Sequence, residues 1–218
     1  MHFLSHYFVE LPNKNSPFVV GLIIPDLTSG FSKIYNSRIK NGIVPEDKNL
    51  LQIHTGILNH YHADKWFHNS GLFVQHTTMA LQSFLKEGLS RYNLRLSVIA
   101  HLTIEMMIDR QIILENKLLC DDFYKAIVQT DESLLETYFL LFGTKNSKSS
   151  FFATFNFFKE RKFLYRFEEL ENIVFGLSKV YGSVTKREFT EEEKKKFVAA
   201  LHNIDNTIRY SWQAILKV

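Results

Sequence analysis

The sequence predicts an all-α protein, and three observations carry that prediction. Apolar residues recur at helical spacing along almost the whole chain, and glycine and proline number only 9 and 4 among 218 residues. The one short apolar run with a β-branched bias is VVGLII at residues 19–24, which fits a buried helical turn as well as a strand. We expect a single all-helical domain, a helical bundle over residues 1–218.

The first half of the chain is expected to hold five helices, bounded largely by glycine and proline. The apolar spacing sets their ranges. The second helix ends before Pro25, the third begins after Pro45, and the fourth lies between Gly71 and Gly88. The five expected ranges are 2–10, 16–24, 47–69, 71–87 and 95–116.

The second half is expected to hold four more helices. Gly143 and Gly182 stand directly after two of them, and Thr190 with Glu193 forms a capping box that opens the last. The expected ranges are 120–142, 148–159, 163–181 and 190–216.

Composition excludes several classes of protein. The net charge of +3 comes from basic residues spread along the chain, which does not favour nucleic-acid binding. Cys120 is the single cysteine, so neither a disulfide framework nor a cysteine metal site is expected. The first residues do not resemble a signal peptide, and no apolar run approaches the length of a membrane span. We therefore expect a cytoplasmic protein; the sequence does not indicate its oligomeric state.

Three ionisable residues lie on the apolar face of the expected helix 47–69. At about 100° per residue, His60, Asp64 and His68 fall on the same arc as the apolar side chains, which are those of Leu50, Ile53, Ile57 and Phe67. Burial of ionisable groups is costly unless they are paired or bind a metal. This row is therefore a candidate metal or catalytic site.

The expected helix 95–116 repeats the pattern. His101, Glu105 and Asp109 share an arc with apolar residues, namely Leu94, Val98, Ile108 and Ile112. Imidazole and carboxylate ligands without thiolate suit Zn, Mn or Fe, and the carboxylate share favours Mn or Fe. Helical bundles often hold metals between such facing rows.

Near the N-terminus, two histidines and one aspartate also occur beside apolar residues. His6 lies among apolar residues with His2 one turn earlier, and Asp26 follows Pro25 at the end of an apolar run. Both His6 and Asp26 are candidate ligands, whereas His2 is left open. The remaining histidines are interpreted as surface or hydrogen-bonded core residues: His54, His62, His76 and His202.

Phenylalanine is concentrated in one stretch, SSFFATFNFFKERKFLYRF, which ends at Phe167. Such a cluster most often packs in the core. The alternative is an exposed aromatic surface or acyl groove that binds a partner, with the interleaved Lys159, Arg161, Lys162 and Arg166 meeting acidic groups.

Five segments resemble those of the acyl-carrier-protein phosphodiesterases (ACP hydrolases), an all-helical family with a divergent HD-type metal site. MHFLSHYFVE resembles the family's opening, VGLIIPDL its glycine-to-aspartate segment, GILNHYHAD its Gly-Ile-x-x-His-x-x-x-Asp motif, and IAHLTIEMMIDR its aspartate-bearing helix. FLYRFEELENIVFGLSKV is similar to a later family stretch with a Tyr and a small-residue helix. The similarity extends over most of the chain through short motifs. It implies a divergent HD-like phosphohydrolase architecture.

The chain departs from the family pattern at several of these positions. Leu22 stands at an asparagine position and Pro25 at an alanine position, His101 and Glu105 replace two aspartates, and Met106 replaces a histidine. GLIIPD also resembles the Gly-x-x-x-Pro-Asp of zinc-dependent phospholipase C-like proteins.

The resemblance implies a metal-dependent phosphodiester hydrolase that releases 4′-phosphopantetheine from holo-acyl carrier protein, or acts on another phosphoester. One or two divalent ions would activate water and neutralise phosphate oxygens. The expected metal ligands are His6, Asp26, His60, Asp64 and Glu105, and the expected catalytic or orienting residues are His101, Asp109 and His68. Two alternatives remain: a phospholipase C-like hydrolase, and a non-catalytic helical protein with buried His–carboxylate networks.

Overall fold

The computed structural model describes residues 1–11, 15–28, 33, 35, 36 and 43–217, and across these residues the chain is helical without any strand. The predicted all-α class is confirmed. The chain forms two compact units, each assembled from segments far apart in sequence. Unit 1 comprises Met1–Ser5, Trp66–Lys117 and Leu164–Val218, and unit 2 comprises His6–Lys65 and Leu118–Phe163.

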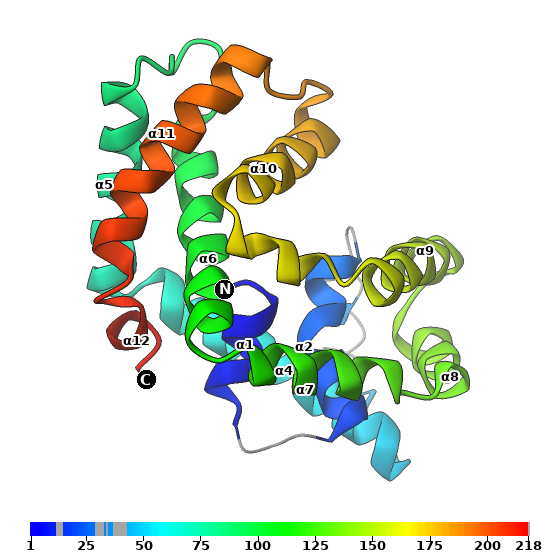
Figure 1. Cartoon of the computed structure of the whole chain (residues 1–218). Coiled ribbons are helices and arrows are strands. Elements are labelled where there is room, and N and C mark those ends of the chain that lie inside the picture. Colours follow the sequence, from blue (N-terminus) through cyan, green and yellow to red (C-terminus); the bar gives the residue numbers. More distant parts are fainter. Residues whose placement is uncertain (12–14, 29–32, 34, 37–42, 218) are drawn as a thin grey trace. The chain divides into compact units, whose positions relative to one another are not determined.

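Unit 1 is built around α6 (Leu96–Glu115), which packs against α5 (Gly71–Lys86), α10 (Leu170–Thr185) and α11 (Glu191–Ile208) (Figure 1). Every residue of α6 from Thr103 to Asp109 is buried, whichever side of the helix it occupies. A helix enclosed in this way places any polar side chain of its middle turns in the interior.

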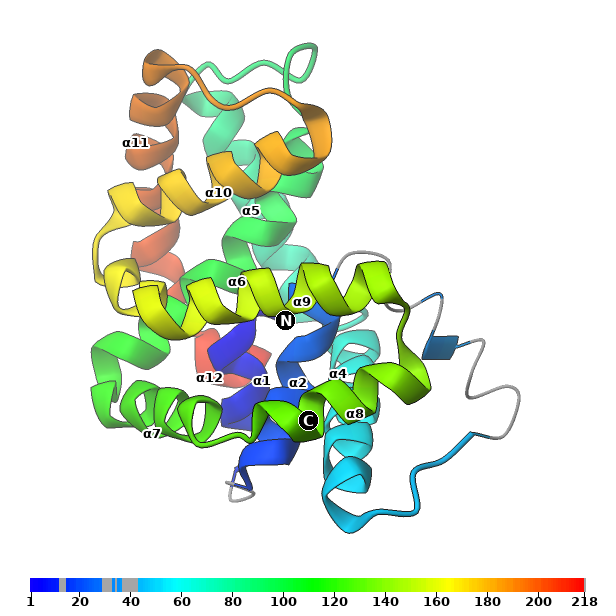
Figure 2. The ribbon, with the colours of Figure 1, turned by 90° about the vertical axis from the view of Figure 1, so that its right-hand side faces the viewer.

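Unit 2 contains α2 (Ser16–Leu27), most of α4 (Lys48–His68) and of α7 (Lys117–Val128), α8 (Glu132–Phe142) and α9 (Lys145–Arg161). Helix α9 packs against both α8 and α2, and Figure 2 shows α8 and α9 following one another along the chain. Helix α1 (Phe3–Val9) begins in unit 1 and ends in unit 2.

Two glycines bring the backbones of α2 and α4 into contact. A Cβ atom on Gly21 would lie 2.3 Å from the carbonyl oxygen of Ile53, and one on Gly56 would lie 2.3 Å from that of Phe18. Any larger side chain at either position would force the helices apart. This close approach brings the end of α2 beside the middle of α4.

Four of the expected helices match the structure closely. The ranges predicted as 2–10, 47–69, 71–87 and 95–116 correspond to α1, α4, α5 and α6 within about one residue at each end. The predicted capping box of Thr190 and Glu193 is present at the start of α11, and VVGLII is helical.

Three predicted boundaries were wrong. Helix α2 continues through Pro25 to Leu27, because a proline near the end of a helix removes only one of its last hydrogen bonds. Residues 120–142 form two helices, α7 and α8, since the Asp131 side chain accepts a hydrogen bond from the Ser133 amide and starts a new one. The segment 148–159 is longer, Lys145–Arg161, and it begins with a capping box between Thr144 and Ser147.

The two C-terminal predictions were each too continuous. The range 163–181 contains the 3-10 helix η1 (Phe163–Glu168) before α10, and 190–216 contains α11 followed by the short α12 (Trp212–Ile215).

The Phe-rich stretch packs mainly in the core, as expected. Phe151, Phe155 and Phe158 are buried, and the ring centroids of Phe151 and Phe139 lie 4.8 Å apart. Phe157 is the exception and is exposed.

Val98 was expected on the buried arc of its helix but is half exposed, because the first turns of α6 are covered on one side only.

No helix in the described part of the chain is both long and apolar enough to cross a bilayer.

Candidate metal centres

Four predicted ligands meet in unit 2, and we call this group centre A. His6 comes from α1, Asp26 from the end of α2, and His60 and Asp64 from successive turns of α4. The Nε2 atom of His60 lies 3.7 Å from Asp26 Oδ1 and 3.4 Å from Asp64 Oδ2, and Nε2 of His6 lies 3.2 Å from Asp64 Oδ1. The His6 and His60 rings stack with centroids 4.0 Å apart.

A backbone hydrogen bond fixes the orientation of His60. Its Nδ1–H donates to the carbonyl oxygen of Leu22 at 2.8 Å, a bond that the glycine contact between α2 and α4 makes possible. Nδ1 therefore carries a proton. Nε2, which faces the two carboxylates, either carries a second proton or presents a lone pair to them. A hydrogen-bonded Nδ1 and a free Nε2 is the usual arrangement of a metal-binding histidine.

His6 is fully buried, and neither ring nitrogen has a partner in hydrogen-bond geometry among the described residues. A buried polar atom without a partner costs about 1–3 kcal/mol, so a native structure that keeps one calls for an explanation. A metal ion that received the Nε2 lone pair would supply the missing partner.

The electrostatics of centre A favour a cation. Burial, helped by the neighbouring His60, lowers the pKa of His6 to about 3, so His6 is neutral. Burial also opposes protonation of His60, but Asp64 and Asp26 outweigh it and raise the pKa of that imidazole. Although burial alone would raise the pKa of Asp64, the neighbouring imidazoles of His6 and His60 hold it well below its usual range.

The spacing of the donor atoms also fits a bound ion. Ligands about 2.1 Å from a metal are separated by about 3.4 Å in tetrahedral and about 3.0 Å in octahedral geometry. All three contacts are long for charge-assisted hydrogen bonds; those of 3.2 and 3.4 Å match these separations, and the contact of 3.7 Å is slightly longer.

A second group, centre B, lies in unit 1 and consists of His68, His101 and Glu105. The Oε1 atom of Glu105 is 2.8 Å from Nε2 of His68 and 3.2 Å from Nε2 of His101. It also accepts a hydrogen bond from the α-amino group of Met1 at 3.0 Å. Burial would raise the pKa of Glu105, yet the amino group and the two imidazoles hold it well below its usual range.

Asp109, the third polar residue on this face of α6, has a different environment. It is fully buried and accepts four hydrogen bonds, from the His2 ring, the backbone amides of Leu4 and Ser5, and the Ser5 hydroxyl. These contacts anchor the first residues of the chain. The catalytic or orienting role expected of Asp109 stays a prediction.

The structure thus divides the predicted residues into three groups. Centre A holds His6, Asp26, His60 and Asp64; centre B holds Glu105 with His68 and His101; and Asp109 pairs with His2. Two contributors were missed: the Leu22 carbonyl, because helical periodicity reports only side chains, and the Ser5 hydroxyl, because an uncharged serine among apolar residues does not indicate a site. His6, Asp26 and His60 form one group that could hold a metal ion, and His68, His101 and Glu105 form another.

The histidines interpreted as ordinary surface or core residues have such environments. His54 is buried with the hydroxyls of Tyr35 and Tyr138 each 3.2 Å from its Nδ1, and His76 is buried with Nε2 3.0 Å from the Ser211 hydroxyl. His62 and His202 are exposed.

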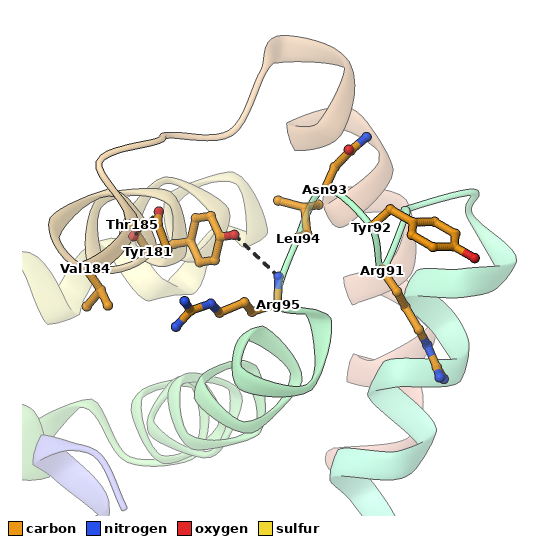
Figure 3. A pocket seen from close by; sticks show the side chains of 8 residues that line it. All are labelled: Arg91, Tyr92, Asn93, Leu94, Arg95, Tyr181, Val184 and Thr185. Atoms are coloured by element: carbon orange, nitrogen blue, oxygen red, sulfur yellow. Dashed lines mark hydrogen bonds between the residues drawn. The ribbon is translucent and has the colours of Figure 1, made fainter.

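One cavity, of about 440 Å³, lies in unit 1 between the segment before α6 and the end of α10 (Figure 3). Its lining contains none of the predicted site residues: it consists of Arg91, Tyr92, Asn93, Leu94, Arg95, Tyr181, Val184 and Thr185. The side chains of Arg91 and Arg95 point apart, so they do not converge on a common ligand.

Fold and site together define an all-helical protein that carries two His–carboxylate groups able to hold metal ions. The chain has no significant match to any family model, curated protein or solved structure with which it was compared.

Proposed function

We propose that the protein is a divalent-metal-dependent phosphodiesterase whose essential ion is bound at centre A. The observation that supports this most directly is the orientation of His60. Its Nδ1–H is held by the Leu22 carbonyl while Nε2 faces Asp26 and Asp64. Two buried imidazoles and two carboxylates without a cysteine suit Mn, Fe or Zn.

The exposure of the ligands indicates where a substrate would approach. The imidazoles are buried, whereas the side chains of Asp26 and Asp64 are 30% and 25% exposed. An ion held from the imidazole side would therefore keep positions open toward solvent on the carboxylate side. Such an ion lowers the pKa of bound water and neutralises phosphate oxygens, which is the chemistry of phosphodiester hydrolysis.

The substrate belongs to the same proposal and rests on the motif resemblance. Gly21, Asp26, His60 and Asp64 occupy the positions at which the chain resembles the ACP phosphodiesterases. We take the substrate to be 4′-phosphopantetheine joined to acyl carrier protein through a phosphodiester. The single cysteine supports a reducing compartment, the cytoplasm.

A non-catalytic helical protein is the second candidate, and Asp109 favours it. That carboxylate is occupied by four protein donors, so one member of the polar rows has a structural role. Under this alternative, centres A and B are also internal ion-pair networks.

Metal analysis tests the proposed site. Protein purified without chelator is expected to carry a transition metal at centre A, and His60→Ala combined with Asp64→Ala should remove that ion. His62→Ala serves as a matched control, because His62 is an exposed histidine of the same helix. An unchanged metal content in the double variant would exclude centre A as the binding site.

Hydrolysis is tested separately, with bis-p-nitrophenyl phosphate and with holo-acyl carrier protein. Release of p-nitrophenol with Mn²⁺, reduced at least a hundredfold in the His60/Asp64 double variant, is expected. Activity on the small diester alone would retain the phosphodiesterase and reject the carrier-protein substrate. Inactivity with Mn²⁺, Fe²⁺ and Zn²⁺ would favour the non-catalytic protein.

A further inference from the structure

Centre B shows the arrangement of a second and chemically different metal site. The Nε2 atoms of His68 and His101 converge on the same carboxylate oxygen of Glu105, at 2.8 and 3.2 Å. All three donor atoms lie within 4.8 Å of one another. The edges of a metal coordination polyhedron measure about 3.0–3.4 Å, so the 3.2 Å contact matches such an edge and the 2.8 Å contact is slightly shorter.

The neighbourhood holds both imidazoles in this orientation. Phe73 of α5 is buried, and its ring lies edge-on to His101 with centroids 4.9 Å apart and 5.4 Å from the centroid of His68. The His68 and His101 centroids are 4.5 Å apart. The Phe73 ring against both imidazoles restricts their rotation. The side chains would therefore lose less conformational entropy when an ion binds.

The composition and exposure of centre B differ from those of centre A. Two of its three ligands are imidazoles, whereas centre A has two imidazoles and two carboxylates. The side chains of His68 and His101 are 32% and 37% exposed, but that of Glu105 is only 8% exposed. An ion at centre B would therefore have three protein ligands and solvent positions beside the imidazoles, which is the composition of an open zinc site.

The position already attracts a cation. The α-amino group of Met1 lies 3.0 Å from Glu105 Oε1 and 3.3 Å from Nε2 of His68. A divalent ion bound by the three side chains would take the place of this ammonium group and carry twice its charge.

We infer that centre B binds a second divalent ion of its own, selects Zn²⁺ over Mn²⁺ and Mg²⁺, and leaves solvent-accessible coordination positions on that ion. Nitrogen-rich sites favour Zn²⁺, whereas Mg²⁺ and Mn²⁺ prefer oxygen ligands. Centre A, with its larger share of carboxylate, accepts Mn²⁺ as well. This inference concerns ion binding and is independent of whether the protein is a hydrolase.

Titration of the metal-free full chain with Zn²⁺ tests the inference, with bound metal counted by elemental analysis and binding followed by calorimetry. The wild type is expected to bind two Zn²⁺ per chain. His101→Ala combined with Glu105→Gln should bind one, the double variant of centre A should also bind one, and His62→Ala should bind two. One Zn²⁺ in the wild type, or two in the His101/Glu105 variant, would overturn the inference.

A second measurement keeps the result interpretable if the variant of buried Glu105 is poorly folded. His101→Ala alone changes a partly exposed side chain, and circular dichroism should show wild-type helix content. The His101→Ala substitution is expected to weaken the affinity for the second Zn²⁺ by at least tenfold and to leave the affinity for the first unchanged. In Mn²⁺, electron paramagnetic resonance should detect one tightly bound ion in the wild type and in His101→Ala alike. Two equally tight Mn²⁺ ions would contradict the predicted selectivity.

Discussion

At the scale of single residues, the surroundings of each polar side chain decide its role more than its position on a helical wheel. His60 and Asp109 both lie on apolar helix faces, and both are buried. His60 has one ring nitrogen bound to a carbonyl and the other turned toward carboxylates, as a ligand would be. Asp109 has its acceptor capacity filled by four donors.

Asp109 provides a test of the anchoring role at this scale. Asp109→Asn should lower the free energy of unfolding by about 3 kcal/mol, because an amide cannot accept from all four donors and leaves buried groups unpaired. Equilibrium urea denaturation measures this. Glu160→Gln, a change at an exposed carboxylate of α9, is the control and should alter stability by less than about 0.5 kcal/mol. A similarly small effect for Asp109→Asn would contradict the anchor.

At the scale of elements, the site depends on how closely α2 and α4 approach. Gly21 and Gly56 let the backbones touch, and the His60–Leu22 hydrogen bond crosses the same contact. The nearby VVGLII run in α2 is buried on all sides. Its sequence therefore lacks the polar residues that recur at helical spacing in a surface helix.

Gly56→Ala tests this contact. The added methyl would overlap the Phe18 carbonyl, so we expect a loss of at least about 2 kcal/mol in unfolding free energy and weaker metal binding at centre A. Chemical denaturation and zinc titration measure the two effects. Gly71→Ala is the matched control: its methyl meets nothing within 4 Å, and alanine favours a helix by up to about 1 kcal/mol. If both substitutions were neutral, the glycine contact would not position the site.

At the scale of the whole molecule, buried neutral histidines link stability to pH. His76 of α5 is buried beside the Ser211 hydroxyl at the start of α12, and burial lowers the pKa of its imidazole. The unfolded chain binds a proton at this histidine below its ordinary pKa of about 6.5, whereas the folded chain resists it. The stability contributed by neutral His76 is therefore complete above that pH and is lost as the pH falls below it.

The corresponding experiment compares unfolding free energies at pH 7.5 and pH 5.5 with a chelator present. His76→Gln should lose less stability than the wild type over this interval. His202→Gln, at an exposed position of α11, should keep the wild-type dependence. Equal slopes for His76→Gln and the wild type would show that His76 does not contribute to the acid sensitivity.

The sequence by itself determined the helical class, most helix positions and the residue types of the candidate site. This was possible because helical periodicity records which side chains face the interior, and His60, Asp64, His101 and Glu105 all fell on such faces. It could not place the break between α7 and α8, where neither glycine nor proline occurs and a local Asp131 cap separates the helices. Only the tertiary structure decided that the predicted ligands form two separate groups, that Leu22 orients His60, and that Asp109 anchors the N-terminal residues. These outcomes depend on contacts between segments far apart in the chain and on backbone groups, neither of which leaves a periodic pattern in the sequence.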